Sequence, residues 1–149
     1  MSVPHDSFYR VAIKGLHVKD GKVLLGLDGG IGWDKTVWDL PGGGLNFGES
    51  FDEGLRREVR EETRMEIMHI ADMPSYVWTY QGENFYGFDS FSVLLLAYRF
   101  EIPSFDTFTA TDECLDLKFF SKEEMMALPN LKEQAKKFVE LYNPLSHKV

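Results

Sequence analysis

Residues 43–65 read GGLNFGESFDEGLRREVREETRM, and most of the predictions about fold and function come from this segment. It carries Glu58, Glu61 and Glu62 at positions i, i+3 and i+4, so a helix gathers the three carboxylates along one side. Three like charges packed this closely repel unless a cation lies among them. Carboxylate oxygens without nitrogen or sulfur ligands suit Mg²⁺ or Mn²⁺. The spacing therefore predicts a divalent metal site and the metal-assisted hydrolysis of a phosphate ester or anhydride.

The position of these glutamates on the helix strengthens the prediction. Ser50 with Glu53 forms a capping-box pattern, which starts the helix near Phe51. At about 100° per residue, an apolar stripe runs along one face, with Glu62 inside it and Glu58 at its edge. An unpaired charge among core residues costs several kcal/mol, so a metal-lined cleft explains the placement. The alternative is a solvated surface helix with i,i+4 pairs such as Arg57 with Glu61. The stripe consists of Phe51, Leu55 and Val59, Glu61 lies further round, and the opposite side holds Arg56, Arg57, Arg60 and Arg64.

The same segment resembles the Nudix box, the signature of the Nudix hydrolase family. In that pattern a glycine is followed after five residues by a glutamate, and after seven more by Arg-Glu-aliphatic-x-Glu-Glu-x-Gly-aliphatic. Arg64 stands where the family has a glycine that ends the helix in a left-handed conformation, which costs a non-glycine residue about 1 kcal/mol. Since Arg64 supplies no ligand, the departure concerns the end of the helix more than the activity. The matching positions are Gly43, Glu49, Arg57, Glu58, Val59, Glu61, Glu62 and Met65.

The resemblance implies a role for each charged residue of the box. Glutamates matching Glu58 and Glu62 typically bind the metal, and one matching Glu61 is a further ligand or a base. An arginine matching Arg57 usually pairs with the glutamate matching Glu49 and stiffens the loop-helix-loop segment. Residues 40–44, LPGGG, look like the loop that leads into the box. Glycines there let the backbone approach a phosphate or a metal and offer carbonyl ligands, so Gly43 is a candidate metal ligand.

Four residues outside this helix are further candidates. Glu113 precedes the last expected strand and resembles an acidic residue that reaches the metal cluster or activates water, although an ordinary loop acid is an equal alternative. Trp38 flanks the glycine turn and could stack on a nucleobase, but a tryptophan on a short strand is more often a core residue. Phe47 is a more exposed candidate for stacking. Asn130 lies where some relatives read a purine, and its simpler interpretation is a helix cap or turn residue.

Composition limits the remaining possibilities. The 149 residues fit one domain, residues 1–149, and contain no repeat or linker. A formal net charge of −8 argues against non-specific binding to nucleic acid. No apolar leader pattern is present, and the longest apolar run, Val93 to Ala97, is too short for a membrane span. The single cysteine, Cys114, fits a reducing cytoplasm. The sequence leaves the oligomeric state open, and a homodimer is possible.

The pattern of elements predicts an α/β/α sandwich with a mixed β-sheet, which also resembles the Nudix fold. Asp20-Gly21 is a strong hairpin signal between the first two strands. We expect strands at residues 8–18, 22–27, 37–40, 67–80, 85–100 and 115–120, and helices starting at 51, running from 121 to 128 and from 131 to 142.

These observations lead to a specific functional hypothesis. We expect a Mg²⁺-dependent hydrolase, with Mn²⁺ as a possible substitute, that cleaves the pyrophosphate link of a nucleoside diphosphate joined to another group. Glu61 or Glu113 would act as the base. A nucleoside triphosphate, canonical or oxidised, is the first choice of substrate, and ADP-ribose or a nucleotide sugar is the second. The rival is a Nudix-fold module that binds a nucleotide without cleaving it, and the presence of all four box glutamates favours the hydrolase.

Overall fold

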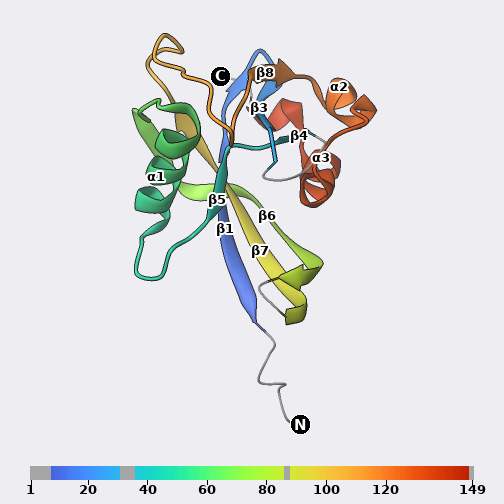
Figure 1. Ribbon diagram of the computed structural model, residues 1–149. Helices are drawn as coiled ribbons and strands as arrows, with labels where there is room; N and C mark the ends of the chain where they lie inside the picture. Colours follow the sequence, from blue (N-terminus) through green and yellow to red (C-terminus); the bar gives the residue numbers. More distant parts are fainter. Residues whose placement is uncertain (1–7, 31–35, 86–87, 148–149) are drawn as a thin grey trace.

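The computed structural model describes residues 8–30, 36–85 and 88–147, and it contains two β-sheets between helices (Figure 1). The first sheet has the order β5-β1-β7-β6, in which β1 and β7 are parallel and the other pairs are antiparallel. The second has the order β2-β3-β4, and β8 pairs with β3. The predicted mixed sheet is confirmed. The strands are β1 (Tyr9–Leu16), β2 (Val18–Lys19), β3 (Lys22–Asp28), β4 (Val37–Asp39), β5 (Gly42–Gly44), β6 (His69–Phe85), β7 (Phe88–Glu101) and β8 (Leu117–Phe120).

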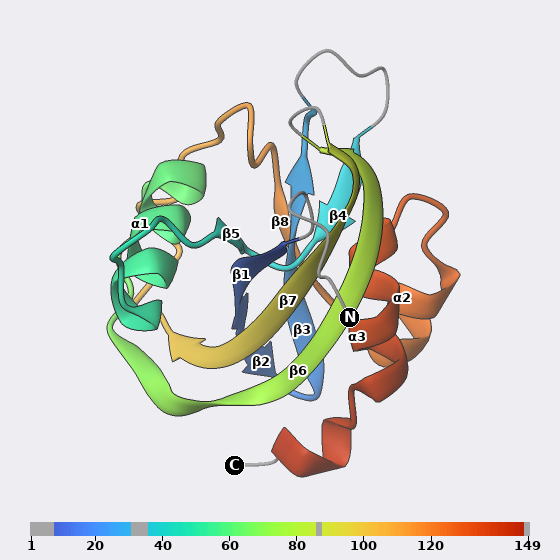
Figure 2. The same ribbon diagram turned by 90° about the horizontal axis from the view of Figure 1, so that it is seen from below.

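The helices lie on opposite sides of the sheets, as the predicted sandwich requires. Helix α1 (Phe51–Thr63) covers one side, and α2 (Lys122–Ala127) and α3 (Lys136–Leu141) cover the other (Figure 2). Leu55 and Val59 of α1 are buried in one core cluster, whereas Phe138 of α3 is buried in a second. The predicted apolar stripe is therefore correct in its middle. It is wrong at its start, because Phe51 on the first turn is 42% exposed and only flanks the ring of Tyr98.

Several predicted boundaries hold, and others do not. Asp20 and Gly21 both have positive φ and form the two-residue turn between β2 and β3. Helix α1 begins at Phe51, where the Ser50 hydroxyl accepts a hydrogen bond from the backbone N–H of Glu53. The predicted strand 8–18 is instead divided after Leu16, since β1 and β2 belong to different sheets.

Two further differences have local reasons. The expected helix over residues 131–142 is a 3₁₀ turn, Glu133–Ala135, followed by the shorter α3. Strand β5 was not predicted, because its three glycines have no strand preference of their own. It forms because these residues pair with β1. Among the described residues, no helix is long and apolar enough to cross a membrane.

Candidate active site

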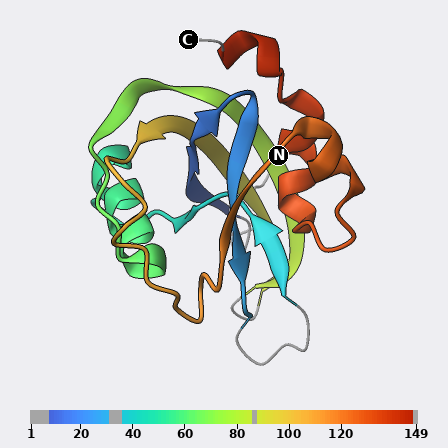
Figure 3. The same cartoon turned by 90° about the horizontal axis from the view of Figure 1, so that it is seen from above.

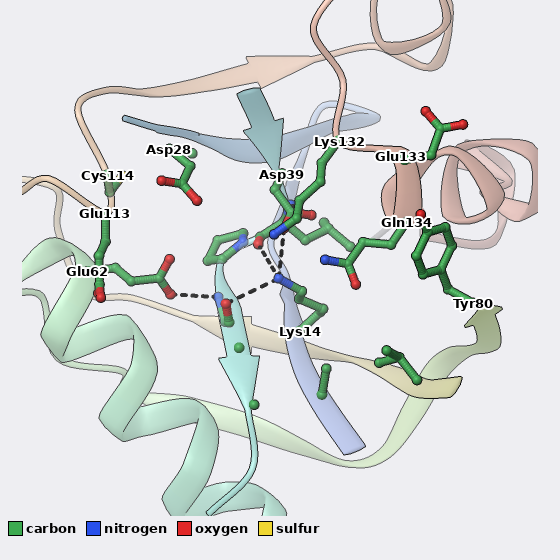
Figure 4. Close-up of a pocket in the computed structure, with 18 of the residues that line it drawn as sticks. Lys14, Asp28, Asp39, Glu62, Tyr80, Glu113, Cys114, Lys132, Glu133 and Gln134 are labelled. Carbon is green, nitrogen blue, oxygen red and sulfur yellow. Dashed lines mark hydrogen bonds and ion pairs between the residues drawn. The ribbon is translucent and has the colours of Figure 1, made fainter. Parts of the chain in front are cut away.

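A cavity of about 630 Å³ opens where the two sheets, α1 and the segment before α3 meet. Glu62, Glu113 and Asp28 lie toward one end of this cavity, and Tyr80 and Gln134 lie toward the other (Figure 4). Lys14, Asp39 and Lys132 lie between the two ends. The cavity thus has an acidic end next to the glycine turn and a mixed polar and aromatic end.

Glu62 projects from the last turn of α1 into the acidic end. The backbone N–H of Gly42 donates a hydrogen bond to its Oε1 at 2.8 Å. The pKa of Glu62 is raised to about 8, first by burial and then by the charges of Glu58 and Asp39, although Lys14 and the Gly42 N–H act in the opposite direction. A carboxylate in this environment is stabilised in its charged form by an added cation.

Glu58 reaches the same turn one residue further along. Its carboxyl group lies so close to Gly43 that a Cβ built on Gly43 would be 2.8 Å from it. A side chain at position 43 would displace the carboxylate, which explains the glycine at the first position of the box. Glu58 and Glu62 therefore contact consecutive residues of the turn, Gly43 and Gly42.

Arg57 joins the loop before α1 to the glutamates. Its guanidinium donates to both carboxylate oxygens of Glu49, at 2.7 and 3.0 Å, and to the carbonyl of Gly44 at 3.0 Å. The structure thus brings Arg57 and Glu49 together, as the resemblance implied. The helical wheel placed Arg57 opposite the glutamates, and this is wrong for its charged end. The long side chain folds back so that Nη1 also donates to Glu58 at 3.0 Å and to Glu61 at 3.2 Å.

Glu61 and Glu113 lie at the outer edge of this group. The Glu61 side chain is 53% exposed and contacts Arg57. Glu113 is exposed on the cavity rim, and its pKa is raised by burial and by the nearby charges of Glu58 and Glu61.

The segment between β7 and β8 carries Glu113 there, because it crosses the C-terminal end of α1 (Figure 3). The Thr111 hydroxyl donates to the carbonyl of Glu62 at 2.7 Å, and the N–H of Thr109 donates to that of Thr63.

The donor set fits a hard divalent cation by its chemistry. Every candidate ligand is an oxygen, and Glu62 is a carboxylate among like charges. Within the described part of the chain, however, no three His, Cys, Asp or Glu side chains converge closely enough to hold a metal ion. Arg57 and the Gly42 N–H hold the glutamates instead.

Sequence reasoning missed Lys14, Asp39 and Lys132. Lys14 is buried, and its Nζ lies 2.9 Å from Oδ2 of Asp39, which also lies 3.7 Å from Nζ of Lys132. Burial lowers the pKa of Lys14, but Asp39 and Glu62 outweigh that effect and raise it overall. For Lys14, the available signal was a charged residue among the uncharged residues of the run from Val11 to Leu16.

The other substrate-binding candidates lie away from the cavity lining. Trp38 is buried and packs edge-on against Phe120, as a core residue does. Phe47 is fully exposed. The side-chain amide of Asn130 donates to the carbonyl of Thr36, a contact between two segments far apart in the sequence. Lys132 and Gln134, close to Asn130 in sequence, line the cavity in its place.

Comparison with known proteins identifies a family. The family profile described as NUDIX domain matches residues 8–142. The chain is 30% identical over 106 residues to the NAD-capped RNA hydrolase NudC of Pseudomonas putida strain GB-1. The aligned region covers 71% of this chain and 35% of that protein. The chain thus spans about a third of the length of the curated relatives it matches.

Solved structures share the fold. The E. coli ORF135 protein superposes with a TM-score of 0.68 at 24% identity, over 93% of this chain and 91% of that one. The MutT protein from Methanosarcina mazei Go1 superposes with a TM-score of 0.64 at 24% identity, over 94% and 96%. A UDP-X diphosphatase superposes with a TM-score of 0.65 at 24% identity, over 90% of this chain and 61% of that one. The predicted α/β/α sandwich is confirmed.

Proposed function

The chain belongs to the Nudix family, and on this premise we propose that it is a hydrolase of the pyrophosphate link in a nucleoside diphosphate joined to another group. The observation that carries the proposal is the contact of Glu58 and Glu62 with consecutive glycines of one turn at the wall of a cavity. Nudix hydrolases generally use divalent metal ions, and oxygen ligands of this kind favour Mg²⁺, with Mn²⁺ as a substitute.

Each side chain has a part in the proposed reaction. Glu58 and Glu62, with Glu61 or the Gly43 carbonyl, would hold the metal. When bound, it would neutralise phosphate charge and acidify the attacking water. Glu113 is a suitable base, because its pKa is raised and it lies on the cavity rim. Glu61 is the alternative base, since it is exposed beside the same group.

Arg57 and Glu49 act as braces. Their bidentate pair fixes the loop before α1, and the third contact of Arg57, with the carbonyl of Gly44, holds the end of the glycine turn. Arg57 also donates a hydrogen bond to Glu58, so its positive charge lies beside one of the proposed ligands.

A nucleoside triphosphate, canonical or oxidised, is the first substrate to test. The cavity volume suits one nucleotide. ADP-ribose and nucleotide sugars follow. NAD and NAD-capped RNA join the panel because of the name of the curated relatives, although the net charge of −8 disfavours a long RNA.

The test compares wild type with Glu62→Gln across this panel, with Mg²⁺ and with a chelator. Loss of a metal ligand removes several kcal/mol of transition-state stabilisation, so kcat/KM on the best substrate should fall at least about 100-fold. Glu53→Gln, which removes an exposed acid from the first turn of the same helix, is the matched control and should keep its activity. Wild-type activity in Glu62→Gln would refute the metal assignment.

The rival function is nucleotide binding without cleavage. It predicts saturable binding of a panel member by calorimetry with no chelator-sensitive product from any of them. Product formation that stops when the chelator is added and returns with Mg²⁺ excludes the rival.

A further inference from the structure

Lys14 is a buried cation that is hydrogen-bonded to the segment leading into the glycine turn. It is 4% exposed on β1, and its Nζ donates to Oδ2 of Asp39 at 2.9 Å, to the carbonyl of Leu40 at 3.3 Å and to the carbonyl of Gly42 at 3.2 Å (Figure 4). An ammonium has three N–H donors, and these three acceptors match them. A buried charge is tolerated only with such compensation.

The contacts of Lys14 continue directly to the glutamates. Gly42 accepts from Lys14 through its carbonyl and donates to Glu62 through its N–H. In the β1–β5 pairing, Lys14 lies opposite Gly42, and Ile13 lies opposite Gly43, the residue against which Glu58 packs. One lysine thus tethers the backbone whose two successive residues contact Glu62 and Glu58.

We propose that Lys14 is a positioning residue that holds residues 39–42 against β1 and so keeps Glu62 and Glu58 in place as metal ligands. This inference rests on the proposed function, because it takes these glutamates as the ligands. Lys14 acts through the turn, and its donors are already occupied by Asp39, Leu40 and Gly42.

The direction in which Mn²⁺ affinity changes when Lys14 is replaced distinguishes a positioning role from a simple charge effect. Lys14 lies near Glu62 and Glu58, so removing its positive charge would by itself tighten the binding of another cation. Loss of positioning has the opposite effect, because the ligands become mobile. Outer contacts of metal ligands are worth about 10- to 100-fold in metal affinity. We therefore expect Lys14→Met to weaken Mn²⁺ binding at least about tenfold, measured from the free Mn²⁺ signal in electron paramagnetic resonance without substrate.

Two further variants control for charge and for folding. Lys132→Met removes the same charge from the same cavity, 3.7 Å from Asp39, and should leave Mn²⁺ affinity unchanged or tighter. Lys14→Met alone leaves the Asp39 carboxylate without its closer cationic partner, so the double variant Lys14→Met with Asp39→Asn is measured as well. The amide introduced by Asp39→Asn keeps an oxygen to accept from the N–H of Leu40, and the double variant should also lose at least about tenfold in affinity.

Glu62→Gln in the same titration distinguishes the two levels of the argument. If Glu62→Gln binds Mn²⁺ as wild type does, the metal assignment of the proposed function is wrong. If Glu62→Gln loses Mn²⁺ while the folded Lys14 variants bind it as tightly as wild type or more tightly, the positioning role is overturned and the proposed function stands.

Discussion

Replacing Arg64 with glycine should stabilise the protein, because Arg64 ends α1 in the left-handed conformation. Its φ is 64° and its ψ is 7°, and its N–H donates to the carbonyl of Arg60. This conformation costs an L-residue about 1–2 kcal/mol relative to glycine. Glycine loses about 0.4–1 kcal/mol of that advantage through the greater freedom of the unfolded chain. The net gain for Arg64→Gly is then about 0.5–1 kcal/mol in the free energy of unfolding.

This free energy corresponds to a measurable change in Tm. With an unfolding entropy of about 2.1 cal/mol/K per residue, a chain of this length gains about 2–3 °C. Thermal unfolding followed by circular dichroism resolves such a shift, and urea unfolding should show a higher midpoint with an unchanged slope.

Arg64→Ala is the matched control for this prediction. It removes the exposed side chain but keeps a Cβ at positive φ, so it should not raise the Tm. An equal gain in both variants would assign the effect to the side chain. A lower Tm for Arg64→Gly would refute the reasoning from backbone conformation.

Three other predictions concern single side chains. Arg57→Lys should lower kcat/KM at least about tenfold in a steady-state assay, because one ammonium cannot replace the bidentate pair with Glu49 and the contact with Gly44; wild-type kcat/KM would contradict this. Burial raises the pKa of Cys114 to about 12, so a disulfide reagent at pH 8 should modify it only after urea unfolding; rapid reaction of the folded protein would be the contrary result. Burial lowers the pKa of His147, so the unfolded state takes up its proton more readily and stability falls as the pH drops through 6.5. The Tm of His147→Gln should therefore fall less between pH 7.5 and 5.5 than that of wild type, and equal falls would exclude this role.

Features that depend only on neighbours along the chain could be predicted without a structure. The start of α1 at Phe51 follows from the Ser50 cap, and the tight turn at Asp20 and Gly21 follows from their tolerance of positive φ. The i, i+3, i+4 spacing brought the glutamates of α1 together in the prediction, because helical periodicity is local. The family and the layered fold were readable for the same reason, since the box lies within 23 consecutive residues.

Only the tertiary structure decided which distant residues meet these glutamates. Strand β5 exists because three glycines pair with β1, and the same pairing brings Lys14 onto the turn that contacts Glu62. Glu113 reaches the cavity because its segment is bound to the end of α1. The family resemblance made Glu113 a candidate, but no local pattern gave either set of contacts, because each depends on hydrogen bonds between segments tens of residues apart. The glutamates of the box lie on one helix, so their spacing could be recognised from the sequence. The glycine turn that contacts them is held in place by its pairing with β1, which the sequence does not show.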